Sequence, residues 1–569
     1  MGRPERQQTI LDLLKNLKGL EPLKQLFWSE LNYERVNQSL ARRGWSDTAS
    51  KALADDPILF ASGGQDDRFH VIYVRLASDA LLLGHERPVV SKLLQDHPYA
   101  LFIFSDKSQN RWHFLNVKYD EQSTKRRLFR RITVGPEERL RTASERISLL
   151  DLSSISLDLF GLSPLTIQTA HDSAFDVEAV TKEFFEKFAV LYHRVTDDIA
   201  EVRGLEKNAR ELAQLILDRM IFLYFIQKKG WLNQQPDYLY EKFIECYQSD
   251  ANGASYYSNF LYPLFLCLSD ASMAFNNIGA VPFLNGGLFE EGSQQTQVEK
   301  LLYARMKIKN RTFKAIFDEL LERFNFTVTE DTPIDMEVAI DPEMLGKIFE
   351  SLILQLEKDP NKDLRRLTGS YYTPRIIVHF MCQEVLKEYL VKQLAEEIPN
   401  NQDQIRQRIN KLLDLPPANQ LDDEQIHLLK DLFTKAEAKV LRQAVFDCRI
   451  CDPAVGSGAF PVGLLHEMTT VVAHLDVIIY SKEVVWHRNF DYDLKKQIIE
   501  NCLYGVDIQE QAVRLCELRL WLSLVVDYEN VKGRILNRSY AKFPVCRIYL
   551  IELYKAIALL RDFSDMSYI

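Results

Sequence analysis

Apolar residues follow first a helical and then a strand-like spacing over the first 155 residues. To about residue 60 they recur at helical spacing, as in Leu11, Leu13, Leu14, Leu17 and Leu20. β-Branched and aromatic residues then form four strand-like runs, with a helical run between the first two. The strands are expected at 69–76, 99–105, 112–119 and 125–132, and the helix at 87–97. This pattern predicts a small α/β domain over 1–155, with its second and third strands joined as a hairpin.

Residues 156–362 show mainly helical periodicity. The clearest helix is expected from Asn208 to Gln227, where apolar residues recur every three or four positions. A later stretch is rich in aromatic side chains: Tyr256, Tyr257, Phe260 and Tyr262. Such rings can stack on nucleic-acid bases, but packing in a hydrophobic core is the favoured interpretation. The middle of the chain is therefore predicted to be a helical domain.

Residues 363–569 alternate between helix and strand. Glu, Lys, Gln and Leu dominate 383–445, which we interpret as a helical insertion interrupted near Pro416 and Pro417. A strand is expected at 445–450, a glycine turn at 452–458 and a helix after it. The α/β alternation continues to a second short strand that ends at Asp507. The fold class is therefore α/β in this part of the chain.

The glycine turn Asp452-Pro453-Ala454-Val455-Gly456-Ser457-Gly458 is the first candidate for chemistry. Glycines let a backbone approach a ligand closely, and the helix that follows offers free N–H groups. In open α/β sheets, ligands bind at such a turn after the first parallel strand. The pattern is neither a dinucleotide GxGxxG nor a phosphate-binding P-loop. An ordinary strand-to-helix turn remains the alternative for this motif taken alone.

Two further motifs flank this turn in a specific order. Thr368-Gly369-Ser370-Tyr371-Tyr372-Thr373-Pro374 lies upstream, and Leu503-Tyr504-Gly505-Val506-Asp507-Ile508 lies downstream. Together the three motifs resemble the amino-terminal part of adenine-N6-specific DNA methyltransferases of the type IIG restriction–modification family. The stretches 208–232, 285–289 and 341–352 resemble the same family, so the resemblance covers most of the chain.

The resemblance implies an incomplete Rossmann-like domain that binds S-adenosylmethionine, preceded by the helical and the small α/β domains. In the family, the first two motifs cradle this methyl donor and the acidic residue after the second strand holds its ribose hydroxyls. The implied donor-binding residues are Tyr372, Thr373, Pro374, Asp452, Pro453, Ala454, Gly456, Gly458, Asp507 and Ile508. Double-stranded DNA is the implied partner, and a carboxylate that accepts two hydroxyl protons agrees with the role given to Asp507.

The family's catalytic tetrapeptide, (Asn/Asp/Ser)-Pro-Pro-(Tyr/Phe), does not occur in these 569 residues. Its polar side chain accepts hydrogens from the adenine amine and its ring stacks on the flipped base. Pro416-Pro417 is the one Pro-Pro pair, and it lies before the glycine turn rather than after Asp507. We therefore expect a fragment that lacks catalytic residues and works with a separate specificity or carboxyl-terminal half. A catalytically inactive DNA-binding or assembly subunit is the alternative.

The composition of the chain excludes few of the functions considered so far. The formal net charge of −10 argues against a general nucleic-acid coat but leaves room for a local basic groove. The amino terminus has no apolar signal region and no apolar run is long enough to span a bilayer, so a cytoplasmic location is expected. Cys448 and Cys451 form a CxxC without nearby partners, and we interpret both as structural cysteines on the strand before the glycine turn rather than metal ligands.

A nuclease centre is a second candidate, in the first domain. Asp106, Asn116 and Lys118 have roughly the spacing of two carboxylates and a lysine that hold Mg²⁺ and activate water. Asn116, however, stands where a carboxylate belongs, and a neutral amide is a poor Mg²⁺ ligand. A DNA-contact or degenerate nuclease-like domain is therefore favoured, and a bifunctional nuclease–methylase stays as the alternative. A basic cluster at Lys125, Arg126, Arg127, Arg130 and Arg131 is a candidate for phosphate contact, or else a solvated charged edge.

Overall fold

The computed structural model describes most of the chain. The described residues are 3–65, 68–81, 83–120, 123–156, 161–228, 230–270, 272–282, 284, 289, 304–327, 335–344, 346–347, 373–397, 402–418, 421, 423–480, 490–527 and 547–550. They form two compact units. The first comprises residues 1–184, 321–327 and 331–340, and the second comprises 185–320, 328–330 and 341–569.

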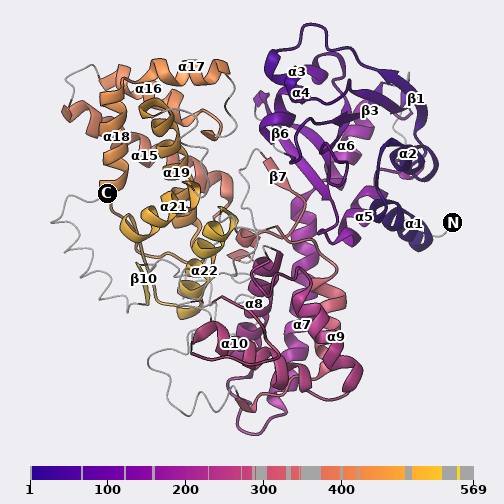
Figure 1. The fold of residues 1–569 in the computed structure, drawn as a ribbon, viewed down its shortest axis with the longest axis vertical. Helices are drawn as coiled ribbons and strands as arrows, with labels where there is room; N and C mark the ends of the chain where they lie inside the picture. The colour runs from indigo at the N-terminus through magenta and orange to yellow at the C-terminus, as the bar shows by residue number, and fades with distance from the viewer. Residues whose placement is uncertain are drawn as a thin grey trace. The chain divides into compact units, whose positions relative to one another are not determined.

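The first unit is built on a seven-stranded mixed sheet whose strands follow the order of the sequence (Figure 1). The strands are β1 (Glu34–Ser39), β2 (Ile58–Gly63), β3 (Phe69–Arg75), β4 (Ala100–Ser105), β5 (Trp112–Asp120), β6 (Ser123–Val134) and β7 (Asp335–Glu337). β3 pairs parallel with β4 and β6 pairs parallel with β7, whereas the other neighbours are antiparallel. The expected β4–β5 hairpin is confirmed.

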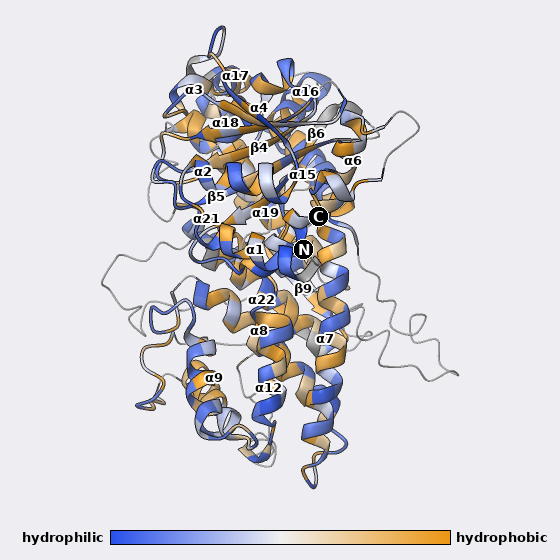
Figure 2. Ribbon diagram, turned by 90° about the vertical axis from the view of Figure 1, so that its right-hand side faces the viewer, coloured by the Kyte–Doolittle hydropathy of each residue, from blue (hydrophilic) through white to orange (hydrophobic). Residues whose placement is uncertain are grey.

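Helices cover both faces of this sheet. They are α1 (Arg3–Lys15), α2 (Leu20–Gln25), η1 (Leu26–Glu30), α3 (Asp47–Lys51), α4 (Leu83–Asp96), α5 (Leu140–Ser148), η3 (Leu152–Ser154) and α6 (Pro164–Ala174). Because side chains alternate along a strand, Ile72 faces α4 in one core while Phe69 packs on His171 of α6 on the other face. β4 is fully buried and is drawn as a hydrophobic segment in Figure 2.

The expectation that residues 1–60 are wholly helical is wrong in its second half. β1 and β2 lie within this range. β1 is an edge strand whose side chains are almost all exposed, so it lacks the alternation of apolar and polar residues that marks a half-buried strand. Pairing with β2, rather than a hydrophobic pattern of its own, holds this segment in the sheet.

The second unit is mainly helical. Its helices are α8 (Ala209–Lys228), α9 (Tyr238–Ser249), η4 (Tyr257–Leu261), α10 (Tyr262–Ser269), α12 (Asn310–Ile316), η5 (Phe317–Leu321), α15 (Arg375–Glu397), α16 (Gln402–Leu413), α17 (Asp423–Leu432), α18 (Lys435–Asp447), α19 (Ala459–Ile479), α21 (Phe490–Asn501) and α22 (Glu510–Asp527), and α7 (Val177–Ala200) enters it from the first unit. The helix expected at 208–227 is confirmed as α8. The aromatic stretch is core, since Tyr256, Tyr257 and Phe260 are buried.

Three parallel strands lie among these helices in the order β10-β9-β8. They are β8 (Ile450–Asp452), β9 (Leu503–Asp507) and β10 (Arg547–Leu550). The strand expected at 445–450 is wrong, because α18 continues to Asp447 and the strand begins only at Ile450. Thr434 and Glu437 form a capping box that starts α18, and its buried apolar face includes Val445. The stretch 383–445 is helical as expected, from within α15 to α18, and its being an insertion stays a prediction.

α19 is the central helix of the second unit. It contacts α15, α18, α21 and α22, and most of its residues are buried. It is also long and apolar enough to cross a membrane by length and composition, which corrects the expectation that no such run exists. Because 83% of its apolar window is buried inside the protein, this helix has the character of a core helix.

Candidate functional site

The candidate site lies at the carboxyl ends of two adjacent parallel strands, β8 and β9. Asp452 is the last residue of β8 and pairs with Gly505, two residues before β9 ends at Asp507. The chain leaves β8 through the glycine turn, whose Val455 N–H donates to the Val506 carbonyl at 2.9 Å. The two strand ends and the turn are thus joined by backbone hydrogen bonds before any side chain contributes.

The glycines of the turn are required by its backbone and its packing. Gly456 and Gly458 have positive φ angles of 52° and 85°, a region that side chains other than glycine rarely adopt. A Cβ on Gly458 would lie 2.6 Å from Cys516 Sγ, so α22 packs directly against the turn. Gly458 also starts α19, accepting the Val462 N–H at 3.1 Å. The turn therefore passes into a helix whose first N–H groups point back toward the strand ends.

Asp507 connects this turn to the end of β9. One carboxylate oxygen accepts the Gly456 N–H at 2.9 Å, and the other accepts the Gln509 N–H at 2.8 Å. Each carboxylate oxygen has two acceptor positions, so each retains one for a ligand hydroxyl. Asp507 is partly exposed and the next residue, Ile508, is 53% exposed, which leaves an apolar side chain beside the open carboxylate.

Asp452 stands beside Asp507 at the neighbouring strand end. Burial raises the pKa of the Asp452 carboxyl, and the negative charge of Asp507 raises it further, while the Ala454 N–H donates to it at 3.0 Å and lowers it. Pro453 and Ala454, which follow it, are exposed. Two adjacent carboxyl groups at one sheet edge create a site that favours a positively charged ligand group.

Thr373 and Pro374 precede α15, and Pro374 accepts the Val378 N–H at 3.1 Å. α15 packs on α19 closely: a Cβ on Gly463 would lie 2.6 Å from the Val378 side chain. His379 and Glu467 join the two helices further along, at 2.6 Å. Thr373 and Pro374 therefore lead into a helix that packs on the helix following the glycine turn. Tyr372 lies outside the described residues.

The polar groups of these residues match those of S-adenosylmethionine in chemistry. Asp507 retains acceptors for a pair of hydroxyls, and the turn has glycines where a Cβ would obstruct the approach of a ligand or a neighbouring helix. The first N–H groups of α19 suit a carboxylate, and Asp452 suits a cation. The arrangement can bind and orient a zwitterionic nucleoside.

The two cysteines of the CxxC lie on different elements. Cys448 caps the end of α18 and only Cys451 lies on β8, so the placement of both on one strand is wrong for Cys448. Burial raises the pKa of the Cys448 thiol to about 12 and also raises that of Cys451. Within the described parts of the chain, no group of three His, Cys, Asp or Glu side chains could hold a metal ion.

The candidate nuclease residues of the first unit lie apart. Asp106 follows the end of β4 beside Trp112, whereas Asn116 pairs with Leu101 at the other end of that strand. Four residues of β5 separate the two positions, or about 13 Å. Asn116 is fully buried, where it donates to Asp172 at 2.7 Å and accepts from Gln168 at 2.9 Å. The spacing along the sequence therefore does not produce one cluster.

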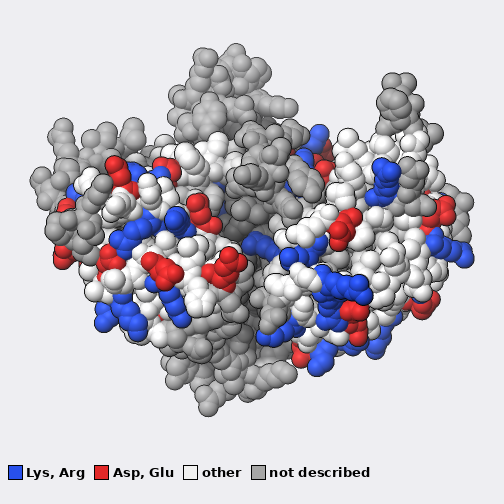
Figure 3. All heavy atoms as spheres, turned by 90° about the horizontal axis from the view of Figure 1, so that it is seen from above, with Lys and Arg blue, Asp and Glu red and all other residues white. Residues whose placement is uncertain are grey.

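The basic cluster on β6 exposes less positively charged surface than expected, because one of its arginines is buried. Arg131 is 8% exposed and pairs with Glu337 of β7 at 3.5 Å, so it faces the protein rather than solvent. Phe129 is buried in the core, with the Arg87 guanidinium over its ring. The side chains of Lys125, Arg126 and Arg127 lie outside the described residues. On the face drawn in Figure 3, basic and acidic side chains are interspersed.

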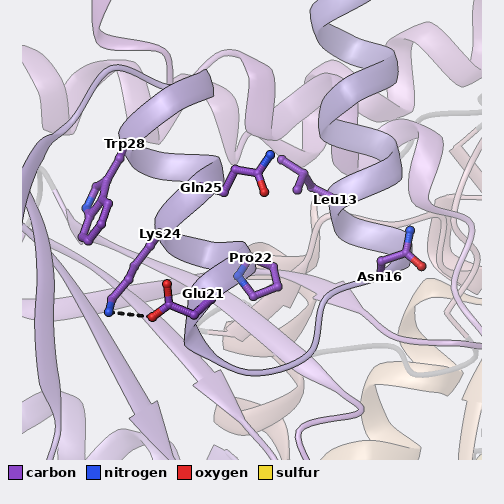
Figure 4. A pocket seen from close by; sticks show the side chains of 7 residues that line it. All are labelled: Leu13, Asn16, Glu21, Pro22, Lys24, Gln25 and Trp28. Atoms are coloured by element: carbon purple, nitrogen blue, oxygen red, sulfur yellow. Dashed lines mark hydrogen bonds and ion pairs between the residues drawn. The ribbon is translucent and has the colours of Figure 1, made fainter.

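A surface pocket of about 510 Å³ lies in the first unit between α1 and η1 (Figure 4). It is lined by Leu13, Asn16, Glu21, Pro22, Lys24, Gln25 and Trp28. Its single cationic side chain, Lys24, already pairs with Glu21 at 2.8 Å and lies over the Trp28 ring. The seven lining residues therefore leave no charged group free for a ligand.

Comparison with known proteins points to one kind of relative. No family model matches the chain. A Methanocaldococcus jannaschii protein, assigned as a candidate type II restriction enzyme and methyltransferase, is 27% identical over 405 residues, which cover 64% of this chain and 31% of the relative. The chain thus spans about a third of the length of this relative.

Two solved structures also match. One is the type IIL restriction–modification enzyme MmeI in complex with DNA, at 14% identity and a TM-score of 0.39, covering 66% of this chain and 40% of MmeI. The other is a DrdV–DNA complex, at 13% identity and a TM-score of 0.27, covering 96% of this chain and 40% of DrdV.

Proposed function

We propose that this chain is the S-adenosylmethionine-binding part of an adenine-N6-specific DNA methyltransferase from a restriction–modification system. The observation that carries the proposal is the Gly456 N–H to Asp507 hydrogen bond, which joins the glycine turn after β8 to the acidic end of β9. A ligand held by the turn would therefore meet the carboxylate. The methyltransferase assignment of the M. jannaschii relative supports the same chemistry.

Different residues would bind the two ends of the donor. Asp507 would accept the two ribose hydroxyls, and exposed Ile508 would lie against the adenine ring. The glycine turn and the first N–H groups of α19 would hold the methionine carboxylate. Asp452 would face the amino group or the sulfonium. In this proposal the three parallel strands are part of a Rossmann-like sheet.

The bound donor would supply a methyl group made electrophilic by the positive sulfur. The residues described here bind and orient that donor, and orientation alone can supply a large share of the rate. The acceptor side requires groups that accept hydrogens from the adenine amine and stack on the flipped base. We propose that a carboxyl-terminal half or a separate specificity subunit contributes them.

α15 offers a surface for such a partner. Five of its apolar side chains are between 44% and 62% exposed: Ile376, Ile377, Phe380, Met381 and Val385. They follow one side of the helix that begins immediately after Pro374. An exposed apolar stripe of this kind is typical of an interaction surface. The partners proposed for the full assembly are this polypeptide and double-stranded DNA, in the cytoplasm, where both DNA and donor are found.

Calorimetric titration of S-adenosylmethionine into the purified chain tests the proposal. We expect saturable binding to the wild type, weakened at least about thirtyfold in Asp507→Ala, since a charge-assisted pair of hydrogen bonds contributes roughly 2 kcal/mol. Asp106→Ala is the matched control, because it removes a carboxylate from the other unit.

A folded wild-type chain that binds no donor would overturn the proposal. Equal loss in Asp507→Ala and Asp106→Ala would do the same, because it would trace the effect to general destabilisation. Transfer of a radiolabelled methyl group to duplex DNA, measured with the carboxyl-terminal half of the relative added, then separates a donor-binding part from a catalytically inactive subunit.

A further inference from the structure

In the second unit, Asp341 contacts Arg375, which follows the Thr373–Pro374 segment, and Gly346 contacts the glycine turn. Gly346 approaches the glycine turn so closely that a Cβ on it would lie 2.6 Å from Ser457 Oγ and 3.0 Å from Ser457 Cβ. Ser457 itself is 3% exposed. The middle of the glycine turn is therefore pressed against the backbone of Gly346, and any larger residue there would displace one of the two segments.

Arg519 of α22 contacts Ser457 from another side. Its Nη1 donates to the Ser457 carbonyl at 2.9 Å, and the Arg519 side chain is 3% exposed. A Cβ on Gly346 would lie 3.4 Å from that nitrogen. Ser457 is thus held between a buried guanidinium and the Gly346 backbone. The turn has little freedom to move away from an enlarged residue at position 346.

Asp341 and Glu343 contact the start of the helix that follows the other donor motif. Arg375, the first residue of α15, pairs with Asp341 at 2.6 Å and with Glu343. Both carboxylates are largely buried, and Asp341 also accepts the Met344 N–H at 3.0 Å. Because Arg375 directly follows Pro374, this pairing fixes where the Thr373–Pro374 segment ends and α15 begins.

We propose that Asp341, Glu343 and Gly346 form a positioning wedge that sets the distance between the glycine turn and the Thr373–Pro374 segment. Gly346 acts through Ser457 on the glycine turn, and Asp341 with Glu343 acts through Arg375 on Thr373–Pro374. This inference rests on the proposed function, since the positioned site is the donor site. None of the wedge residues is proposed to touch the donor.

The test is a rescue experiment read by calorimetric titration of S-adenosylmethionine and by thermal unfolding. Gly346→Ala should weaken donor binding about tenfold by shifting Ser457. Ser457→Gly alone should weaken it modestly, through the added flexibility of the turn. In the double variant, removal of the Ser457 side chain makes room for the new Cβ, so donor affinity should return to the level of Ser457→Gly alone.

A second variant covers the case in which Gly346→Ala does not fold. Asp341→Asn keeps the acceptor for the Met344 N–H but removes the charge that faces Arg375. We expect donor affinity to fall about threefold to tenfold. Lys347→Ala, which changes a side chain next to the wedge, should bind the donor as the wild type does.

The outcomes separate the wedge from the donor site itself. If wild type binds the donor and Asp507→Ala does not, the proposed function stands whatever the wedge variants do. If Gly346→Ala and Asp341→Asn then bind with wild-type affinity, the wedge is wrong. Additive losses in the Gly346→Ala/Ser457→Gly double variant would also overturn it, because they would show that the contact is not transmitted through Ser457.

Discussion

Asp106 in the first unit directly follows a β-strand and Asp507 in the second is the last residue of one, yet their surroundings differ. Asp106 is 3% exposed and accepts three hydrogen bonds, from the Asn110 N–H at 2.8 Å, the Arg111 N–H at 3.3 Å and the Ser108 hydroxyl at 2.7 Å. Asp507 accepts two, from Gly456 and Gln509, and stays partly exposed.

This difference teaches how to tell a structural carboxylate from a binding one. A carboxylate has about four acceptor positions. Those of Asp106 are mostly occupied by its own turn within the chain, and the side chain is buried, so little acceptor capacity faces a ligand. Asp507 has two acceptors free at an open strand end beside a glycine turn. Position after a strand predicts neither state; the local supply of donors decides it.

The largest expected effect is on donor affinity. It is measured by replacing each of these two carboxylates with an amide, in separate variants. Asp507→Asn should weaken S-adenosylmethionine binding by about a hundredfold, or roughly 2.7 kcal/mol, because a neutral amide accepts hydroxyl protons poorly and at only one atom. Asp106→Asn should leave donor affinity unchanged and lower the stability of the first unit by about 1–2 kcal/mol. Calorimetric titration and thermal unfolding of both variants give the two values.

The comparison fails if the two variants behave alike. A donor affinity lowered equally by Asp106→Asn would trace the loss to general destabilisation rather than to a carboxylate of the donor site. An unchanged affinity in Asp507→Asn would mean that its open acceptors are not used.

A smaller effect is expected on the free energy of unfolding. Alanine substitution at two glycines distinguishes the cost of backbone strain from the cost of a steric clash at the glycine turn. Gly458 and Gly204 have nearly the same φ angle, 85° and 90°, but a Cβ on Gly204 would meet nothing within 4 Å. Gly204→Ala should therefore cost only the left-handed strain, about 1 kcal/mol. Gly458→Ala should cost about 2 kcal/mol more, because its Cβ collides with Cys516. Urea unfolding of the two variants measures the difference, and equal costs would show that α22 gives way freely.

Much of the fold could be predicted from hydrophobic spacing alone. The alternation of β-branched and aromatic residues located β3 to β6, and helical periodicity located α8, because in both cases burial of one face or of the whole element leaves its mark on the sequence. β1 left no such mark, since its side chains are almost all exposed. β7 could not be predicted either, because it is a three-residue strand whose Glu337 pairs with Arg131 of β6, 206 positions earlier in the chain.

The candidate site was predictable where a motif has a local backbone requirement. Gly456, Gly458 and Asp507 meet as expected because glycine turns and strand-end carboxylates follow from local chain geometry. Gly346 and Arg519 were missed. Both act on Ser457 from distant parts of the chain, and only the packing of the second unit brings them there. The strand before the turn was misplaced because Val445, an apolar residue of the expected strand, belongs to the buried face of α18.

Two buried histidines, one in each unit, allow the stability of the two units to be compared at acid pH. Burial lowers the pKa of His171 in the first unit to about 3 and that of His474 in the second to about 4. In each case the unfolded chain binds a proton below about pH 6.5 that the folded unit does not, so stability is present above that pH and is lost as the pH falls. Each histidine should reduce stability by about 1 kcal/mol at pH 5.5 relative to pH 6.5.

Thermal unfolding from pH 7 to pH 5 measures this loss. His171→Gln, which cannot titrate, should flatten the pH dependence of the first unit and leave that of the second unchanged. An unaltered slope in this variant would mean that His171 is protonated in the folded protein.

The smallest expected effect concerns Asp452, whose partly buried carboxylate costs stability but would help to bind the donor. Its raised pKa means that the folded protein holds the proton more tightly than the unfolded chain, so stability is lost as the pH rises through the raised pKa. Asp452→Asn keeps the acceptor for the Ala454 N–H and removes the buried charge. We therefore expect a slightly higher melting temperature at pH 7, together with a donor affinity about threefold lower from loss of a carboxylate near the donor's positive groups. Below the ordinary pKa of aspartate, Asp452→Asn and the wild type should melt at the same temperature. If Asp452→Asn instead melts below the wild type at pH 7, the Asp452 carboxylate stabilises the turn, as the carboxylate of Asp106 does in the first unit.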